Sequence, residues 1–246
     1  MNERLTQMNH TEWITHIMDY KVKYPLTYPK TGLSGPYVIE DIYKETNGDA
    51  IIVTEVGQHQ MWAAQYYKYK KPRTLLTSGG LGTMGYGLGA AIGAQIGCPD
   101  KQVINIAGDG CFRMNMNELA TAARCGRQLI QIVMNNHVLG MVRQWQTLFY
   151  GKRYSATCLR RRKSCPAECK GPNSSCPPYT PDFVKLVESY GGYGIRVEKE
   201  EDIDAAFAKA KEHRDVPVII EFMIATDEIV LPMVKSGNPM SEMILK

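Results

Sequence analysis

The stretch that decides the fold runs from Val103 to Trp145 and reads VINIAGDGCFRMNMNELATAARCGRQLIQIVMNNHVLGMVRQW. Two short apolar runs, 103–107 and 129–134, are typical of buried strands, and residues 114–124 between them carry apolar side chains at helical spacing. This order predicts a right-handed βαβ unit whose two strands end at the same edge of a parallel sheet. We therefore expect an α/β fold with a mostly parallel sheet, helices on both faces and a ligand at that edge.

Polar residues follow both predicted strands. Gly108-Asp109-Gly110 comes after the first, and Asn136, 27 positions beyond Asp109, comes after the second. Mg²⁺ takes oxygen ligands, often one or two from side chains and the rest from phosphates, backbone and water. Gly110 and Cys111 open a helix whose free N–H groups can bind phosphate. The pair favours a magnesium–diphosphate site over the alternative, two ordinary turns with a capping Asp and a strand-end Asn.

A family resemblance rests on GDG followed by NN and on four further strings. These are VGQHQMWAAQ (56–65), SGGLGTMGYGLGAAIGAQIG (78–97), GMVRQWQTLFY (140–150) and VLPMV (230–234). Over residues 37–234, apart from one insert, the chain resembles the C-terminal thiamine-diphosphate (PP) domain of the acetohydroxyacid synthase (acetolactate synthase) large subunit. The resemblance implies a thiamine-diphosphate-binding fold and a transferase activity of branched-chain amino-acid biosynthesis. In that reaction pyruvate loses CO₂ and its two-carbon unit joins a second 2-oxo acid.

The resemblance also assigns cofactor contacts. Gln58 and His59 are expected to donate hydrogen bonds to the diphosphate, and Mg²⁺ is expected on Asp109, Asn136 and the backbone carbonyl of Val138. The other residues expected around the cofactor are Gly82, Met84, Gly108, Gly110, Cys111 and Met141. As an ordinary alternative, His59 is a helix-start residue in a polar turn.

Two further assignments concern catalysis and the substrate. Met84 is expected to bend the cofactor from below, and the Gly82 carbonyl is expected to accept a hydrogen bond from its pyrimidine amino group. Met141 and Trp145 are expected to line the substrate channel, where Trp favours a larger second oxo acid. Core packing is the ordinary alternative for Met84 and for the stripe that Met141 and Trp145 share.

The same resemblance divides the chain into a lead-in segment (1–35), the diphosphate-binding domain (36–235) and a tail (236–246). In the family, FAD is bound by a preceding domain that these residues do not include. A Glu from the pyrimidine-binding domain of a neighbouring subunit protonates the cofactor's N1′. We therefore expect the chain to need a pyrimidine-binding half or a homo-oligomer partner, and to turn over little pyruvate alone.

A Cys-rich insert at 155–180 departs from the family pattern. It contains four cysteines within nineteen residues, spaced C-x₆-C-x₃-C-x₆-C: Cys158, Cys165, Cys169 and Cys176. Such a group in a cytosolic loop more often binds a metal than forms disulfides. Zn²⁺ and a [4Fe–4S] cluster are both open as occupants, and free thiols are the alternative.

Composition limits the remaining functions. The 246 residues carry a net charge of +4, and the segment 158–179 alone accounts for this excess, with five Lys/Arg against one Glu. The balanced remainder argues against a nucleic-acid partner. Neither a membrane-spanning run nor a signal peptide is evident, so a cytoplasmic protein is expected.

Two other functions remain open. One is the thiamine-binding subunit of a 2-oxoacid:ferredoxin oxidoreductase, which would account for a short chain with four cysteines. The QHQMW and GMVRQWQ strings argue against it. The other is a non-catalytic remnant that binds only cofactor or partner subunits.

Overall fold

The computed structural model describes residues 8–30, 32–166, 168–169, 171–174, 176 and 181–245. Part of the predicted insert (167, 170, 175 and 177–180) lies outside the described residues, as do 1–7, 31 and 246. The chain forms two compact units, one ending at Lys30 and one beginning at residue 31. Within the described ranges, no helix is both long enough and apolar enough to cross a bilayer.

The first unit contains helix α1 (Thr11–Lys23). The Asn9 side chain accepts a hydrogen bond from the Thr11 amide at 2.9 Å. Asn is among the residues most often found at helix starts, because its side-chain oxygen can bind an amide that has no partner within the helix.

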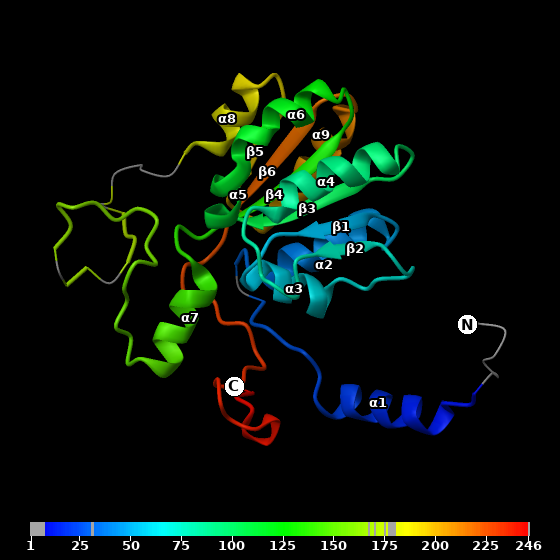
Figure 1. Cartoon of the computed structure of the whole chain (residues 1–246), viewed down its shortest axis with the longest axis vertical. Coiled ribbons are helices and arrows are strands. Elements are labelled where there is room, and N and C mark those ends of the chain that lie inside the picture. Colours follow the sequence, from blue (N-terminus) through cyan, green and yellow to red (C-terminus); the bar gives the residue numbers. More distant parts are fainter. Residues whose placement is uncertain are drawn as a thin grey trace. The chain divides into compact units, whose positions relative to one another are not determined.

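The second unit is built on six parallel strands in the order β2-β1-β3-β4-β6-β5 (Figure 1). Their bounds are β1 Ile51–Thr54, β2 Leu75–Thr77, β3 Val103–Gly108, β4 Leu129–Asn135, β5 Tyr193–Val197 and β6 Pro217–Met223. The predicted parallel α/β fold is confirmed. The chain moves outward from β1 to β2 and then returns to β3 on the other side of β1, so the strand order reverses between β1 and β3.

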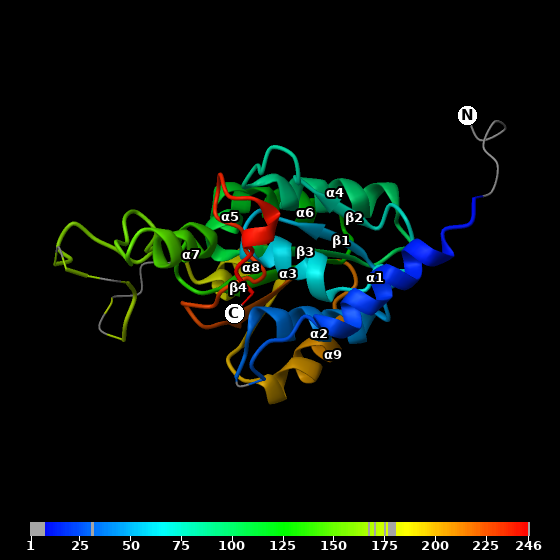
Figure 2. The same cartoon turned by 90° about the horizontal axis from the view of Figure 1, so that it is seen from below.

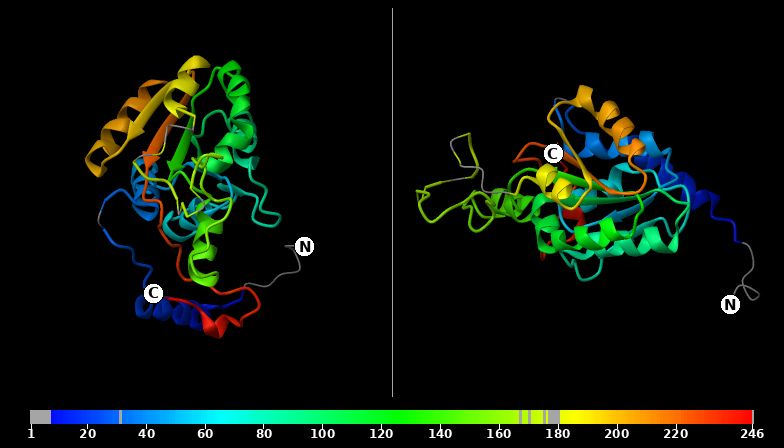
Figure 3. Two further views of the ribbon diagram at one scale, coloured as in Figure 1. Left: turned by 90° about the vertical axis from the view of Figure 1, so that its left-hand side faces the viewer. Right: turned by 90° about the horizontal axis from the view of Figure 1, so that it is seen from above.

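Helices cover both faces of this sheet (Figures 2 and 3). One face carries α2 (Gly35–Thr46), α3 (Gln58–Tyr66) and α9 (Ile203–Glu212). The other carries α4 (Tyr86–Gly97), α5 (Asp109–Asn115), α6 (Leu119–Arg124) and α8 (Phe183–Ser189). Helix α7 (Gly140–Phe149) follows β4, and short 3-10 turns span Met116–Glu118, Glu200–Asp202 and Met240–Glu242.

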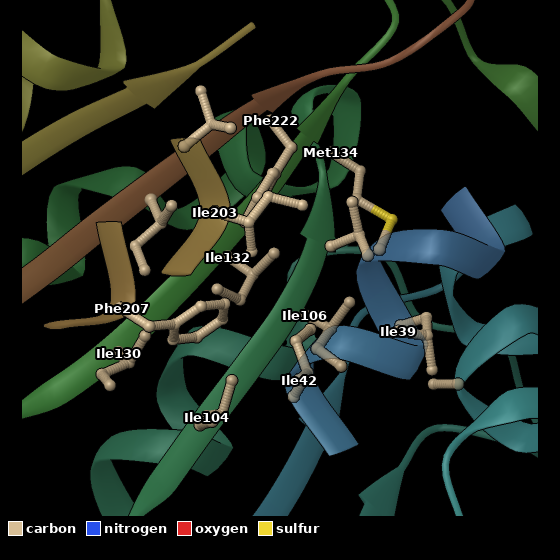
Figure 4. Packing of buried hydrophobic residues seen from close by; sticks show 14 of the residues in the cluster. Ile39, Ile42, Ile104, Ile106, Ile130, Ile132, Met134, Ile203, Phe207 and Phe222 are labelled. Carbon is tan, nitrogen blue, oxygen red and sulfur yellow. The ribbon is translucent and has the colours of Figure 1, made fainter. Parts of the chain in front are cut away.

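Apolar strand residues form a core on each face because these strands are covered on both sides. In Figure 4, Ile104 and Ile106 of β3 and Ile130 and Ile132 of β4 lie between the side chains of α2 and those of α9, and none of the four is exposed to solvent. Burying a side chain of this size stabilises the fold by about 1.5–3 kcal/mol. Strands buried on both faces have continuous apolar sequences rather than alternating ones, which is why their positions could be predicted.

A helix begins at Asp109, beside the start predicted at Gly110 and Cys111. It does not continue to Arg124 as the apolar spacing over 114–124 predicted, because a 3-10 turn at Met116–Glu118 separates it from α6. Asn115 ends α5 with its side chain donating to the Gly85 carbonyl at 2.7 Å. Because Asn115 pairs with another part of the chain, the break depends on a contact that the spacing of apolar residues does not show.

A buried carboxylate connects β1 to the start of α4. Glu55 is fully buried, and its oxygens accept hydrogen bonds from the amides of Gly85 and Gly87, both at 2.8 Å. Burial raises the pKa of Glu55, while these amides act to lower it. A Cβ on Gly87 would lie 2.5 Å from Asn105 Oδ1 and 2.9 Å from Glu55 Cγ. Only glycine therefore allows α4 to approach these side chains so closely.

Two substitutions in α4 test this close approach. Gly87→Ala is expected to lower the free energy of unfolding by about 1–3 kcal/mol, the usual cost of overpacking. Gly93→Ala is the matched control, because a Cβ there meets nothing within 4 Å, and it is expected to raise stability by about 0.5–1 kcal/mol. Urea unfolding measures both, and equal stability of the two variants would contradict the packing argument.

Candidate functional site

A cavity of about 80 Å³ lies where β1, β3 and β4 end. Its walls come from the turn after β1, the GDG turn after β3, and the loop after β4 that leads into α7. The carboxyl ends of parallel strands near a reversal of strand order are the usual ligand site of open α/β sheets. The cavity therefore lies at the edge that the sequence pattern predicted.

Asp109 and Asn136 approach the same short loop. The Asp109 carboxylate accepts a hydrogen bond from the His137 amide at 3.1 Å, and the Asn136 side-chain oxygen accepts one from the Val138 amide at 3.1 Å. Asp109 is only 1% exposed, and burial raises its pKa to about 7. A buried carboxylate whose charged form is disfavoured in this way is suited to a cation that would stabilise that form.

His59 is neutral at physiological pH. Burial lowers its pKa to about 3, although a hydrogen bond to the Glu55 backbone acts in the opposite direction. The ring lines the cavity, and its Nε2 is buried without a hydrogen-bond partner among the described residues. Buried polar atoms are rarely left unsatisfied, so an unpartnered ring nitrogen at a cavity indicates a place for a ligand's polar group.

Gln58, the neighbour of His59, already pairs within the protein. Its amide nitrogen donates to Gln144 Oε1 at 2.9 Å and to the Glu228 carbonyl at 2.6 Å. Its Oε1 is buried without a partner among the described residues. A Cβ on Gly140 would clash with this oxygen, so glycine at the start of α7 leaves room for it.

Nearly all the predicted cofactor and magnesium residues line this one cavity: Gln58, His59, Met84, Gly108, Asp109, Gly110, Cys111, Asn136, Val138 and Met141. Gly82 is not among its lining residues. It lies two positions before Met84, in the left-handed region with φ +62°. Cys111 donates its thiol to the Val56 carbonyl at 2.8 Å, and burial raises its pKa to about 12.

The face of α7 that carries Trp145 points outward. Trp145 and Val142 are 45% and 43% exposed and lie beside a separate surface hollow with Gln146, Tyr150 and Arg153. The buried residues of α7 are polar, Arg143 and Gln144. The alternative that the whole apolar stripe packs in the core is therefore wrong, because Trp145 and Val142 are exposed. Met141, from the same stripe, lines the cavity.

Residues after β6 pair with the buried side chains of α7 beside the cavity, a role that the sequence did not predict. Gln144 donates to the Val230 carbonyl at 2.9 Å and accepts from the Val230 amide at 2.7 Å. Arg143 forms an ion pair with Asp227 at 2.6 Å. The available signal was the polar pair Arg143-Gln144 between the apolar residues Val142 and Trp145, but the partners of this pair lie more than 80 positions away.

The four insert cysteines are not among the residues that line this cavity. All four are free thiols, and within the described part of the chain no three His, Cys, Asp or Glu side chains are grouped so that they could hold a metal ion. Cys158 and Cys169 line a small hollow beside Arg143. Metal binding by the insert stays a prediction.

Comparison with known families and structures agrees with this geometry. The model of the thiamine pyrophosphate enzyme C-terminal TPP-binding domain matches residues 55–222. A solved structure, the thiamine diphosphate-dependent 4-hydroxybenzoylformate decarboxylase of Rhodococcus jostii RHA1, aligns with a TM-score of 0.67 and 26% identity. The alignment covers 82% of this chain and 34% of that one.

Several curated relatives are acetolactate synthases. The chain is 47% identical to the large subunit from Corynebacterium glutamicum over 94% of its own length and 35% of the relative's. It is 41% identical to the mitochondrial catalytic subunit from Saccharomyces cerevisiae over 95% of its own length and 32% of the relative's. The chain thus spans about a third of the length of these relatives.

The segment after β6 gives a pH-dependent prediction. Glu228 accepts a hydrogen bond from the Gly35 amide at 2.9 Å, and burial raises its pKa from 4.5 to about 7. Between these values the folded chain binds a proton that the unfolded chain has lost. The contribution of protonated Glu228 to the free energy of unfolding is therefore complete below about pH 4.5 and is lost as the pH rises through about 7.

Glu228→Gln should remove this loss of stability at high pH, because glutamine does not ionise. At pH 8 the variant is expected to be more stable than the parent by on the order of 2 kcal/mol, after allowance for partial exposure, and at pH 5 the difference should be small. Urea unfolding at the two pH values measures it, with the exposed Glu212→Gln as control. An equal effect of Glu228→Gln at both pH values would show that Glu228 does not titrate as described.

Proposed function

The chain belongs to the family of thiamine pyrophosphate enzymes through their C-terminal TPP-binding domain, and on that premise we propose that it is the cofactor-binding part of an acetolactate synthase. In the proposed reaction, pyruvate is decarboxylated and its two-carbon unit is joined to a second 2-oxo acid, a step of branched-chain amino-acid biosynthesis. The observation that carries the proposal is the convergence of the QH, GDG and NN residues on one cavity. The identity to acetolactate synthases supports the choice of substrate.

The donor groups at the cavity support Mg²⁺ as the metal. Asp109 offers a carboxylate, Asn136 a carboxamide oxygen, and Val138 a backbone carbonyl, all of which line the cavity. Mg²⁺ prefers such oxygen ligands and leaves its remaining positions to phosphate oxygens and water. The buried charge of Asp109 would then be balanced by the cation rather than by a proton.

The residues around the metal are proposed to hold and shape the cofactor. Thiamine diphosphate, when bound, supplies the electron sink for decarboxylation. The negative charge of the diphosphate would favour the protonated form of His59, whose Nε2–H would then donate to it, and Gln58 lies beside it. Met84 supports the cofactor from the loop before α4, whose start is fixed by Glu55, and the nearby Gly82 carbonyl accepts from the pyrimidine amino group. Met141 lines the cavity and excludes water.

A partner is proposed to complete the pocket, either a pyrimidine-binding half or another copy of the chain. Leu81, next to Gly82, is 95% exposed, and Met114 on α5 is also exposed. Large apolar side chains beside a ligand cavity are typical of a surface that another domain covers. Trp145, exposed on α7, is proposed to contact the second oxo acid when that surface is covered.

Reconstitution tests the activity. The purified chain with thiamine diphosphate, Mg²⁺ and pyruvate is expected to form little acetolactate, because half of the cofactor pocket would be missing. Acetolactate should form when a separately expressed pyrimidine-binding half is added. Full activity without that half would contradict the need for a partner. Cofactor binding without acetolactate in the mixture would indicate a non-catalytic remnant, and pyruvate-dependent ferredoxin reduction would favour the oxidoreductase subunit.

Asp109→Asn separates folding from cofactor binding. Loss of a residue that only supports a metal ligand already costs about 10- to 100-fold in metal affinity, so loss of this charge should weaken Mg²⁺-dependent thiamine diphosphate binding by at least about 10-fold. Because Asp109 is buried, the neutral variant should melt no earlier than the parent without Mg²⁺. Titration calorimetry with the pyrimidine-binding half present measures the affinity.

The exposed Asp100→Asn is the control for this variant and should bind as the parent does. Unchanged cofactor affinity in Asp109→Asn would exclude Asp109 as a magnesium ligand.

A further inference from the structure

The Cys-rich insert begins directly beside the cofactor cavity. Cys158 forms an isolated antiparallel bridge with Val138. On either side of it, the Leu139 amide donates to the Thr157 carbonyl at 2.8 Å and the Leu159 amide donates to the His137 carbonyl at 2.9 Å. The first cysteine therefore has a fixed backbone position, next to the loop that carries Val138.

The other three cysteines each end a turn of the same kind. The amides of Cys165, Cys169 and Cys176 donate to the carbonyls of the residues three positions before them, at 3.1, 3.1 and 3.0 Å. Two of these turns also direct an amide at sulfur: Arg162 N lies 3.3 Å from Cys165 Sγ, and Asn173 N lies 3.5 Å from Cys176 Sγ. Hydrogen bonds of this kind favour a thiolate, the form in which cysteine binds metals.

Contacts within the insert join segments that carry cysteines up to eighteen positions apart. Cys158 and Cys169 line the same small hollow. The Arg160 guanidinium donates to the Cys176 carbonyl and so brings the last turn back to the first cysteine.

Basic residues surround the cysteines. Arg160, Arg161, Arg162 and Lys163 follow Cys158 directly. Arg143 of α7 lines the hollow that contains Cys158 and Cys169. Four thiolates around a divalent cation leave a net charge of −2, and these cations would offset it. The spacing of Cys165 and Cys169, C-x₃-C, falls within the range common in structural zinc sites, whereas the ferredoxin run C-x₂-C-x₂-C-x₃-C is absent from the insert.

We propose that the insert binds one structural Zn²⁺ through the thiolates of Cys158, Cys165, Cys169 and Cys176. On binding, four thiols release their protons to solvent and four sulfur–zinc bonds form without any change of oxidation state. Among the described residues the sulfur atoms are not yet grouped as ligands, so the insert must close around the ion. Metal binding and folding are usually coupled in structural zinc sites, because the free energy of binding stabilises the folded form of the site.

Arg143 connects the closed insert to the cofactor cavity. Its guanidinium lies 3.8 Å from the ring centroid of Tyr154, and a Cβ on Gly171 would lie 3.1 Å from it. Arg143 also pairs with Asp227, and it belongs to the same helix as Met141. Zinc in the insert would therefore support the wall of the cavity that α7 provides.

Metal content and protease protection test the site on the full chain. The chain purified under reducing conditions should contain about one zinc per molecule by plasma mass spectrometry. Cys165→Ser and Cys176→Ser should each weaken zinc binding by at least about 10-fold. Cys98→Ser and Cys125→Ser, outside the insert, are matched controls and should keep the parent's zinc content. Trypsin should cleave at Arg160–Lys163 much faster after chelation and return to the slow rate when Zn²⁺ is restored.

Four results would overturn the proposal. They are a chain that binds no zinc, zinc retained at parent affinity in both insert variants, iron with acid-labile sulfide in place of zinc, and disulfides among the four cysteines in the presence of reductant. Thermal unfolding of all variants shows whether the domain remains folded, and each insert variant is expected to melt at the temperature of the parent after chelation.

Discussion

The parallel alignment of β1, β3 and β4 is the constraint on which the site depends. These strands are direct neighbours, with Thr54 paired to Ile106 and Gly108 paired to Met134. Because they run in the same direction, the three segments that leave them start at one edge of the sheet. Residues from three distant parts of the sequence are thereby brought to one cavity, and none of them needs to be held by a long loop.

Buried polar contacts then fix the walls of that cavity. Gln58, Gln144 and Val230 are connected by hydrogen bonds of 2.7–2.9 Å, and each contact joins segments 86 positions apart. A single buried hydrogen bond adds only about 0.5–1.5 kcal/mol, but leaving one partner unsatisfied costs about 1–3 kcal/mol. Breaking one of these hydrogen bonds while its partner stays buried would therefore cost more free energy than the bond contributes to stability. Such a network keeps α7 and the segment after β6 in one relative position.

The sequence predicted what depends on local pattern. The apolar runs placed β3 and β4 to within one residue, and the strand-end positions of Asp109 and Asn136 predicted their common edge. It did not predict the partners of Glu55, which accepts hydrogen bonds from the amides of Gly85 and Gly87 at the start of α4. The buried polar face of α7 was also missed. Both depend on contacts between distant segments, and apolar periodicity does not contain that information.

The hydrogen bonds made by residues after β6 affect where this domain can be said to end. Judged by apolar packing alone, the domain is nearly complete at Met223, the last residue of β6. Yet the carbonyl of Glu228 and both backbone groups of Val230 satisfy the two buried glutamines beside the cavity. A chain cut just beyond β6 would keep its sheet but lose these hydrogen-bond partners. The side chains of Gln58 and Gln144 would then need water molecules as partners. The sheet and the cavity of this protein thus have different C-terminal limits.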